Sequence, residues 1–196
     1  MCNDYRYRMP LEQLIDEFAQ LRIPLRFPAG RPNLEPREDI RISERAPVIL
    51  ADVDGAAAAL SMARWSWPGP GGKPVFNFRS DGRRFGQGRC LIPADGFYEF
   101  TVPADPAAKR KDKWLFTLAG GGPFAIAGLW RAGAANGEDA WTMLTCAPGP
   151  DIADYHDRQV VILQPPQWGE WLFVRDNEAT LLKPLPGGTL QVERAA

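Results

Sequence analysis

RCLIPADGFYEF, residues 89–100, contains two short apolar runs on either side of a turn that includes Asp95 and Gly96. The runs RCLIP (89–93) and GFYEFT (96–101) have the length and the residue types of β-strands. A glycine-containing turn between two such runs indicates that one strand ends and another begins. This stretch therefore predicts two consecutive strands.

Six further segments repeat this pattern of a short apolar run bounded by glycine- or charge-rich turns. They are PVILA (47–51), ALSMARW (59–65), KWLFTLA (113–119), PFAIAGLWR (123–131), AWTMLTCA (140–147) and QVVIL (159–163). Many short strands separated by turns are typical of barrels and sandwiches rather than of βαβ units. The predicted fold class is α+β, in the form of a compact β-rich fold with barrel-like antiparallel sheets and a few flanking helices.

Two segments have the features of helices. In PLEQLIDEFAQLR (10–22) the apolar residues recur at helical spacing, and the leading proline suits a first turn. A second helix is predicted for residues 167–173, opened by Pro165 and Pro166. The proline- and charge-rich stretch between the first helix and Pro47 has no clear periodicity, so it predicts an extended loop.

The length of 196 residues fits a single domain, 1–196. No apolar run approaches the ~20 residues of a membrane span, and no secretory signal follows the N-terminal arginines. We therefore expect a cytoplasmic protein without a membrane partner. Three widely spaced cysteines argue against a disulfide framework, and with the only histidine they lack the paired spacing of a zinc site. No cofactor and no metal are predicted.

Positive charge is concentrated between Arg64 and Arg89, where six Lys or Arg residues stand against one Asp. Tryptophans and phenylalanines are interleaved with these cations. Cations that contact phosphates, mixed with aromatic rings that stack on bases, are typical of a single-stranded nucleic-acid groove. A loop whose aromatic residues belong to the core explains the composition equally well. A second basic cluster, KRKDK (109–113), is interpreted as the flank of a hairpin.

Four polar residues are candidates for chemistry. Glu99 lies in an aromatic strand, where burial would raise its pKa and make it a general acid or base, although a solvent-facing position is equally compatible. His156 stands at the mouth of an apolar strand, in a position that is more often structural. Asn77 and Arg79 are two residues apart, so an extended backbone places them on one face.

Six motifs occur in a fixed order: a cysteine directly after Met1, then RPNLEP, NFRSDG, RCLIPADGFYEF, MLTCA and YHDRQVVIL. Together they resemble the SOS-response-associated peptidase (SRAP) family, over the range from Cys2 to about Leu163. The resemblance implies a compact β-rich SRAP-like domain that forms a DNA–protein crosslink with abasic sites in single-stranded DNA during the DNA damage response. We expect a monomer that is nucleoid-associated when bound to DNA.

The resemblance also implies roles for individual residues. The catalytic set is Cys2 as the nucleophile, with Asn77, Glu99 and His156. The DNA-binding set is Asn33, Pro36, Trp65, Trp67, Arg79, Arg84, Thr145 and Arg158. The chain has Asn3 and Asp4 where the family usually has Gly-Arg. Arg6 or Arg8 is the expected substitute for the missing arginine.

An N-terminal cysteine suits this chemistry once Met1 is removed, either by an aminopeptidase or by the protein itself, as the family's name implies. The α-amine, with a pKa near 7.7–8.0, attacks the aldehyde of an opened abasic sugar, and the adjacent thiol then closes a thiazolidine ring. A lyase activity is a further expectation.

Two alternative functions remain open. One is a thiol hydrolase or peptidase that pairs Cys2 or Cys146 with His156, and the other is a non-catalytic single-stranded DNA-binding module.

Overall fold

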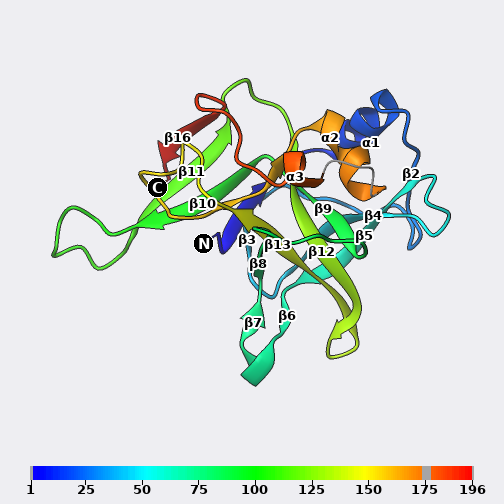
Figure 1. Cartoon of the computed structure of the whole chain (residues 1–196), viewed down its shortest axis with the longest axis horizontal. Helices are drawn as coiled ribbons and strands as arrows, with labels where there is room; N and C mark the ends of the chain where they lie inside the picture. Colours follow the sequence, from blue (N-terminus) through cyan, green and yellow to red (C-terminus); the bar gives the residue numbers. More distant parts are fainter. Residues whose placement is uncertain (1, 174–177, 196) are drawn as a thin grey trace.

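The computed structural model describes residues 2–173 and 178–195. One of its sheets has five antiparallel strands (Figure 1). Their order is β16 (Leu190–Arg194), β11 (Asp112–Leu118), β10 (Gly96–Thr101), β1 (Asp4–Tyr7) and β3 (Arg37–Arg41). Strand β1 therefore has a neighbour on each side, and Tyr5 lies opposite Phe97 of β10 and Ile40 of β3. The N-terminal strand is held inside the sheet.

The second sheet closes on itself. Its main path runs through β13 (Glu138–Cys146), β12 (Phe124–Ala135), β9 (Arg89–Ala94), β4 (Arg45–Ala51) and β5 (Ala58–Trp65). A parallel pairing of β5 with β13, in which Trp65 lies opposite Trp141, completes a circuit of five strands. The predicted β-rich, barrel-like fold class is confirmed.

Short strands extend or border this barrel. Strand β2 (Leu25–Arg26) pairs with β5, β15 (Ile162–Leu163) pairs with β12, and both β8 (Asn77–Arg79) and β14 (Gln159–Val160) pair with β13. Strands β6 (Trp67–Pro68) and β7 (Pro74–Val75) form a separate ribbon around a 3-10 turn, Pro70–Gly72. The pairing of β8 with β13 brings Asn77 and Arg79 onto the barrel.

Helices gather at one end of the barrel (Figure 1). Helix α1 (Leu11–Gln20) and helix α2 (Pro165–Leu172) meet through the rings of Phe18 and Trp168, whose centroids are 5.2 Å apart. Helix α3 (Glu178–Leu181) is a single turn. Both predicted helices are confirmed; α2 begins two residues earlier than predicted because proline is accepted in the first turn of a helix. No described helix has the length and apolar character that crossing a membrane requires.

An aromatic cluster joins the two sheets. The ring of Tyr5 on β1 packs edge-on against Trp65 and Trp141, with centroid distances of 5.5 and 6.1 Å, and the two tryptophans stack on each other at 5.3 Å. All three side chains are fully buried. Such rings bury large apolar areas, so this cluster fixes the position of β1, and with it that of Cys2, relative to the barrel.

Candidate functional site around Cys2

Cys2 lies directly before β1 and is held by two hydrogen bonds. The side-chain amide of Asn77 donates to the Cys2 carbonyl oxygen at 2.7 Å, and the Cys2 thiol donates to the Asp4 carbonyl oxygen at 3.2 Å. The other amide atom of Asn77, Oδ1, is buried and has no hydrogen-bond partner among the described residues. The structure thus brings Asn77 to Cys2 and leaves an acceptor available beside the nucleophile.

Glu99 reaches the same region from β10. Tyr5 pairs with Phe97 in the antiparallel ladder, and continuing this register places Glu99 opposite Asn3. The side chain of Glu99 is 1% exposed, and burial raises the pKa of Glu99 to about 7. A carboxyl with this pKa exchanges protons readily at neutral pH. Of the two alternatives for Glu99, the buried position is the one observed.

His156 approaches Glu99 from the segment between β13 and β14. Its Nε2 atom is 3.9 Å from Oε2 of Glu99. The backbone N–H of Arg158 donates to Nδ1 at 2.9 Å, which requires an unprotonated Nδ1 and leaves the proton of the neutral ring on Nε2. Nδ1 is also 2.8 Å from the exposed carboxylate of Asp157, a contact that needs a proton on Nδ1, as in the imidazolium or in the other neutral tautomer. Burial lowers the pKa of His156, so the neutral ring describes the resting state.

Arg158 and Thr145 support the site from behind His156. The Arg158 guanidinium donates to the Thr145 carbonyl oxygen at 2.9 Å and to Asp81 Oδ2 at 2.6 Å. Only 12% of the Arg158 side chain is exposed, and Thr145 is buried. These bonds engage Nη2 of Arg158 inside the protein. The predicted DNA contact of either residue remains a prediction, whereas their bracing contacts are observed.

Arg79 and Arg84 are exposed, as an interface with phosphates requires. Arg79 lies opposite Thr145 in the ladder of β8 and β13, next to the Cys2 region. Arg84 lines a separate cavity of about 440 Å³ together with Phe78, Phe85 and Trp130. Both remain predicted DNA-binding residues. In the described parts of the chain, no three His, Cys, Asp or Glu side chains converge as metal ligands.

Comparisons with known proteins agree with this arrangement. The family model for the SOS response associated peptidase (SRAP) matches residues 1–195. The chain belongs to the SRAP family. It is 28% identical to the abasic site processing protein YobE of Bacillus subtilis (strain 168), over 94% of this chain and 88% of YobE. The abasic site processing protein YoqW of the same organism is 36% identical over half of this chain and 43% of YoqW.

Solved structures share the SRAP fold seen here. A crystal structure of a protein from Bordetella bronchiseptica superposes with a TM-score of 0.73 and 25% identity, covering all of both chains. A protein from Bacteroides thetaiotaomicron has a TM-score of 0.70 at 16% identity, covering all of this chain and 92% of the other, which supports the fold alone. The predicted family and fold class are confirmed.

The two tryptophans predicted to contact DNA are not open surfaces in this SRAP chain. Trp65 is fully buried, and its indole N–H donates to the Phe76 carbonyl oxygen at 2.9 Å. A ring without exposed surface offers no face to a base, so the placement of Trp65 at the DNA surface is wrong. Trp67 is 5% exposed and is covered by the Arg131 guanidinium, 4.6 Å above its ring. Stacking of a base on Trp67 would require Arg131 to move.

The basic stretch also supplies fewer free cations than its composition suggests. Arg89 is buried, lies 3.3 Å from a carboxylate oxygen of Glu178 and stacks over the Trp171 ring. The Arg83 guanidinium lies over the Phe78 ring.

Asn33 lies in the loop before β3, and its side-chain amide donates to the nearby Glu35 carboxylate at 2.7 Å. A role for Asn33 and Pro36 in DNA binding remains a prediction.

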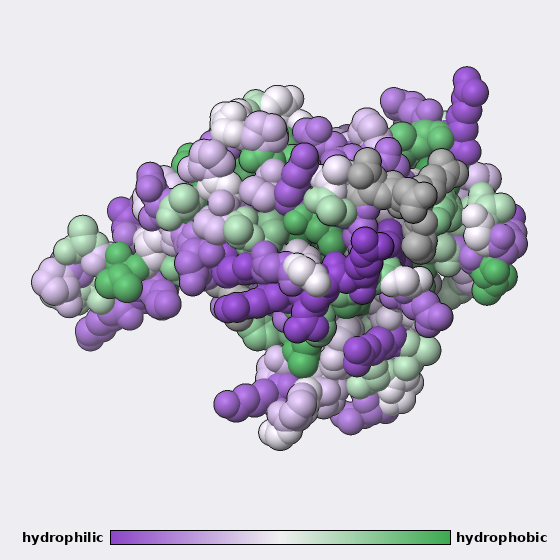
Figure 2. Space-filling model, in the orientation of Figure 1, coloured by the Kyte–Doolittle hydropathy of each residue, from purple (hydrophilic) through white to green (hydrophobic). Residues whose placement is uncertain are grey.

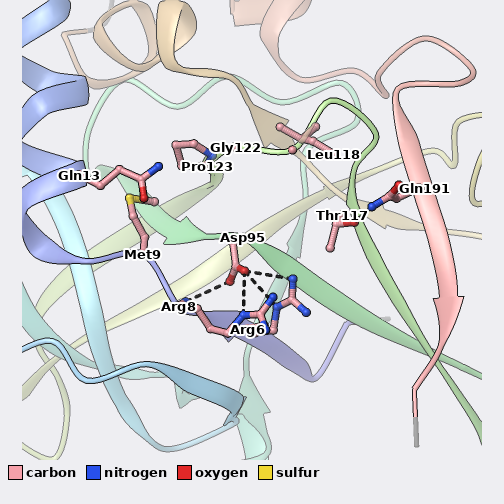
Figure 3. A pocket seen from close by; sticks show the side chains of 11 residues that line it. Arg6, Arg8, Met9, Gln13, Asp95, Thr117, Leu118, Gly122, Pro123 and Gln191 are labelled. Carbon is pink, nitrogen blue, oxygen red and sulfur yellow. Dashed lines mark hydrogen bonds and ion pairs between the residues drawn. The ribbon is translucent and has the colours of Figure 1, made fainter.

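Arg6 and Arg8 bond to Asp95, as Figure 3 shows. Nε of Arg6 and Nε of Arg8 lie 3.1 and 3.3 Å from the same Asp95 oxygen, in a pocket of about 390 Å³ beside α1.

Sequence reasoning missed the partner of Asp4, which is Lys113 Nζ at 2.8 Å. Position 4 therefore carries a carboxylate in an ion pair rather than a free cation.

Proposed function

We propose that this SRAP protein processes abasic sites, and that Cys2, once Met1 is removed, bonds covalently to the opened abasic sugar in single-stranded DNA. The observation that carries the proposal is the convergence of Asn77 on the Cys2 carbonyl, beside a buried Glu99 that has a pKa of about 7 and faces His156. The names of the relatives YobE and YoqW as abasic site processing proteins support the same substrate.

The chemistry needs no oxidant or reductant. The Cys2 amine adds to the C1′ aldehyde, the carbinolamine loses water to give an imine, and the thiol adds to the imine carbon to close a thiazolidine. One water is released overall. Burial raises the pKa of the Cys2 thiol well above its ordinary value, so ring closure requires a base. Glu99 serves as that base and as the acid that protonates the departing hydroxyl. The buried Oδ1 of Asn77 would accept a hydrogen bond from the amine.

The thiol hydrolase alternative is less well supported by these side chains. Such an enzyme needs a thiolate beside an imidazole. Burial raises the pKa of Cys146 to about 12 and that of Cys2 also well above its usual range. A non-catalytic binding module has no use for an ionisable carboxyl buried beside Cys2, and burying such a group costs free energy.

Intact-protein mass spectrometry tests the proposal. The protein is mixed in parallel with a single-stranded oligonucleotide that contains one abasic site and with the same oligonucleotide carrying an ordinary base. We expect an adduct with the mass of protein plus abasic oligonucleotide minus one water, and no adduct with the control. A hydrolase would leave no persistent DNA adduct, and a binding module would leave none under denaturing conditions.

Arg79 is predicted to contact a DNA phosphate. The Arg79→Gln variant should bind single-stranded DNA more weakly, and the slope of log affinity against log salt should fall by about 0.7, the value for one phosphate contact. Fluorescence anisotropy at several salt concentrations measures the slope. Arg22→Gln removes the same charge just beyond helix α1 and should leave the slope unchanged. An unaltered slope for Arg79→Gln would place this residue away from the phosphates.

His156 is predicted to donate a proton when the crosslink reverses. Burial lowers the pKa of His156 below 6.5, so the imidazolium forms only in acidic solution, and release should accelerate as pH falls through that lowered value. The His156→Ala variant should reach a similar adduct yield but lose this acceleration. A chase of preformed adduct with excess competitor across pH, with thermal stability as the control, gives the release rates. Equal rates at every pH would assign His156 a structural role only.

A further inference from the structure

A second cleft, of about 920 Å³, opens beside the start of β1, on the face of the five-stranded sheet to which Asp4 and Phe100 belong. We call it the hairpin cleft because the loop between β10 and β11 forms one wall. This loop projects from the body of the molecule at the left of Figure 1. Six Lys or Arg side chains line the cleft against two Asp: Arg41, Lys109, Arg110, Lys111, Lys113 and Arg194, with Asp4 and Asp112.

Two of these cations are neutralised within the protein. Lys113 bonds to Asp4 and Asp39, and Arg194 bonds to Asp112. The remaining four, namely Arg41, Lys109, Arg110 and Lys111, have no ion-pair partner in residues 2–173 and 178–195. Figure 2 shows hydrophilic and hydrophobic residues side by side on the projecting loop. The cleft therefore has an excess of positive charge that internal ion pairs do not use.

The hairpin cleft begins at the residues that follow the reacting groups. Asn3 and Asp4 come directly after Cys2, Phe100 comes directly after Glu99, and all three line the cleft. A strand that leaves Cys2 around the end of β1 would enter this cleft.

Free cations together with a partly exposed aromatic ring suit a nucleic-acid strand. Lysine and arginine contact the phosphates, and Phe100 offers a face on which a base can stack without regard to sequence. The exposed Arg79 lies on β8, on the barrel side of Cys2. Exposed cations near the nucleophile therefore lie on two different sheets of the molecule, on β8 of the barrel and in the cleft beside β1.

We propose that the hairpin cleft binds backbone phosphates of the single-stranded DNA on one side of the abasic site, while the Arg79 surface binds the other side. This inference rests on the proposed function. It predicts a polarity, because removing charge from the cleft should weaken binding only for oligonucleotides that extend from the lesion in one direction.

The test compares two labelled oligonucleotides, one with a non-reactive abasic analogue at the 5′ end and one with it at the 3′ end. The Lys109→Gln/Lys111→Gln variant should lose about tenfold in affinity for only one of them, and its salt slope should fall by about 1.4, twice the single-strand value of 0.7. Arg22→Gln/Lys183→Gln, which removes the same charge at two exposed positions outside the cleft lining, should alter neither. Equal losses for both oligonucleotides, or no loss for either, would overturn the inference.

A separate readout keeps this result distinct from the proposed function. Adduct mass is measured at saturating reactive abasic oligonucleotide, where weaker binding no longer limits the yield. We expect the Lys109→Gln/Lys111→Gln variant to give the parental yield. Absence of an adduct in the parent protein would refute the crosslinking function, whereas a normal adduct without polarity-dependent binding would refute the hairpin cleft alone.

Discussion

Cys2→Ala should reduce the yield of stable adduct with abasic single-stranded DNA by more than about hundredfold. The variant still carries an α-amine after removal of Met1, so it can form the imine, but it has no thiol to close the ring. Tethering of the amine and the thiol to adjacent carbons makes ring closure an intramolecular step, with a large advantage over reversal by water. Denaturing gel electrophoresis and intact mass measure the surviving adduct.

Cys2→Ser is the matched control for this prediction. Its hydroxyl can close only the more labile oxazolidine, so an adduct should appear early and disappear on standing. Treatment with borohydride should trap the imine of both variants, which would show that the amine still reaches the sugar. A Cys2→Ala adduct as durable as that of the parent would exclude the thiazolidine.

Glu99→Gln is expected to slow adduct formation by about 10²- to 10⁴-fold, the range associated with loss of a general acid–base group. Gln is nearly the same size and stays neutral, so the geometry around Cys2 should persist. The parental rate should depend on pH around 7, because burial raises the pKa of Glu99 to about 7. Single-turnover measurements from pH 5 to 9 should show this dependence in the parent and not in the variant.

The same substitution should stabilise the fold at alkaline pH. Raising the pKa of an acid on folding penalises its ionised form, so Glu99 costs stability progressively above its ordinary pKa of 4.5, and fully above about 7. The difference between these two pKa values corresponds to about 3 kcal/mol. Urea unfolding at pH 8 should therefore show Glu99→Gln to be more stable than the parent, and at pH 4 the two should agree. Glu193→Gln, at an exposed position of β16, should change neither value.

A Glu99→Gln variant that forms the crosslink at the parental rate would show that Glu99 takes no part in the mechanism.

Helices and strands with a clear apolar pattern could be predicted from the sequence. Strands that are held in place by ion pairs to distant residues could not. Strands β9 to β13 and helix α1 follow apolar runs or helical spacing. Strand β1, DYRY, has no such pattern, yet all four residues are buried. Asp4 pairs with Lys113 and Arg6 with Asp95, partners that lie far along the chain. Strand β3 falls within the segment that was predicted as a loop. It pairs with β1, so it could not be predicted before β1 itself.

The candidate site shows the same division. The resemblance identified Cys2, Asn77, Glu99 and His156, but only the fold brings Glu99 and His156 within 3.9 Å. The exposure of aromatic residues could not be predicted, because it depends on which strands close the barrel. The parallel pairing of β5 with β13 stacks Trp65 on Trp141 and removes Trp65 from the surface.

The place of β1 in its sheet determines how the proposed adduct would bear a mechanical load. DNA attached at Cys2 pulls on the end of a strand that has an antiparallel ladder on each side, to β3 and to β10. A pull along the strand loads the hydrogen bonds of both ladders in shear, so they resist together rather than opening one after another. Resistance to forced unfolding is set by the unfolding rate. A polymerase or helicase that collides with the adduct would therefore meet a folded protein for longer than if the link ran through a loose terminal tail.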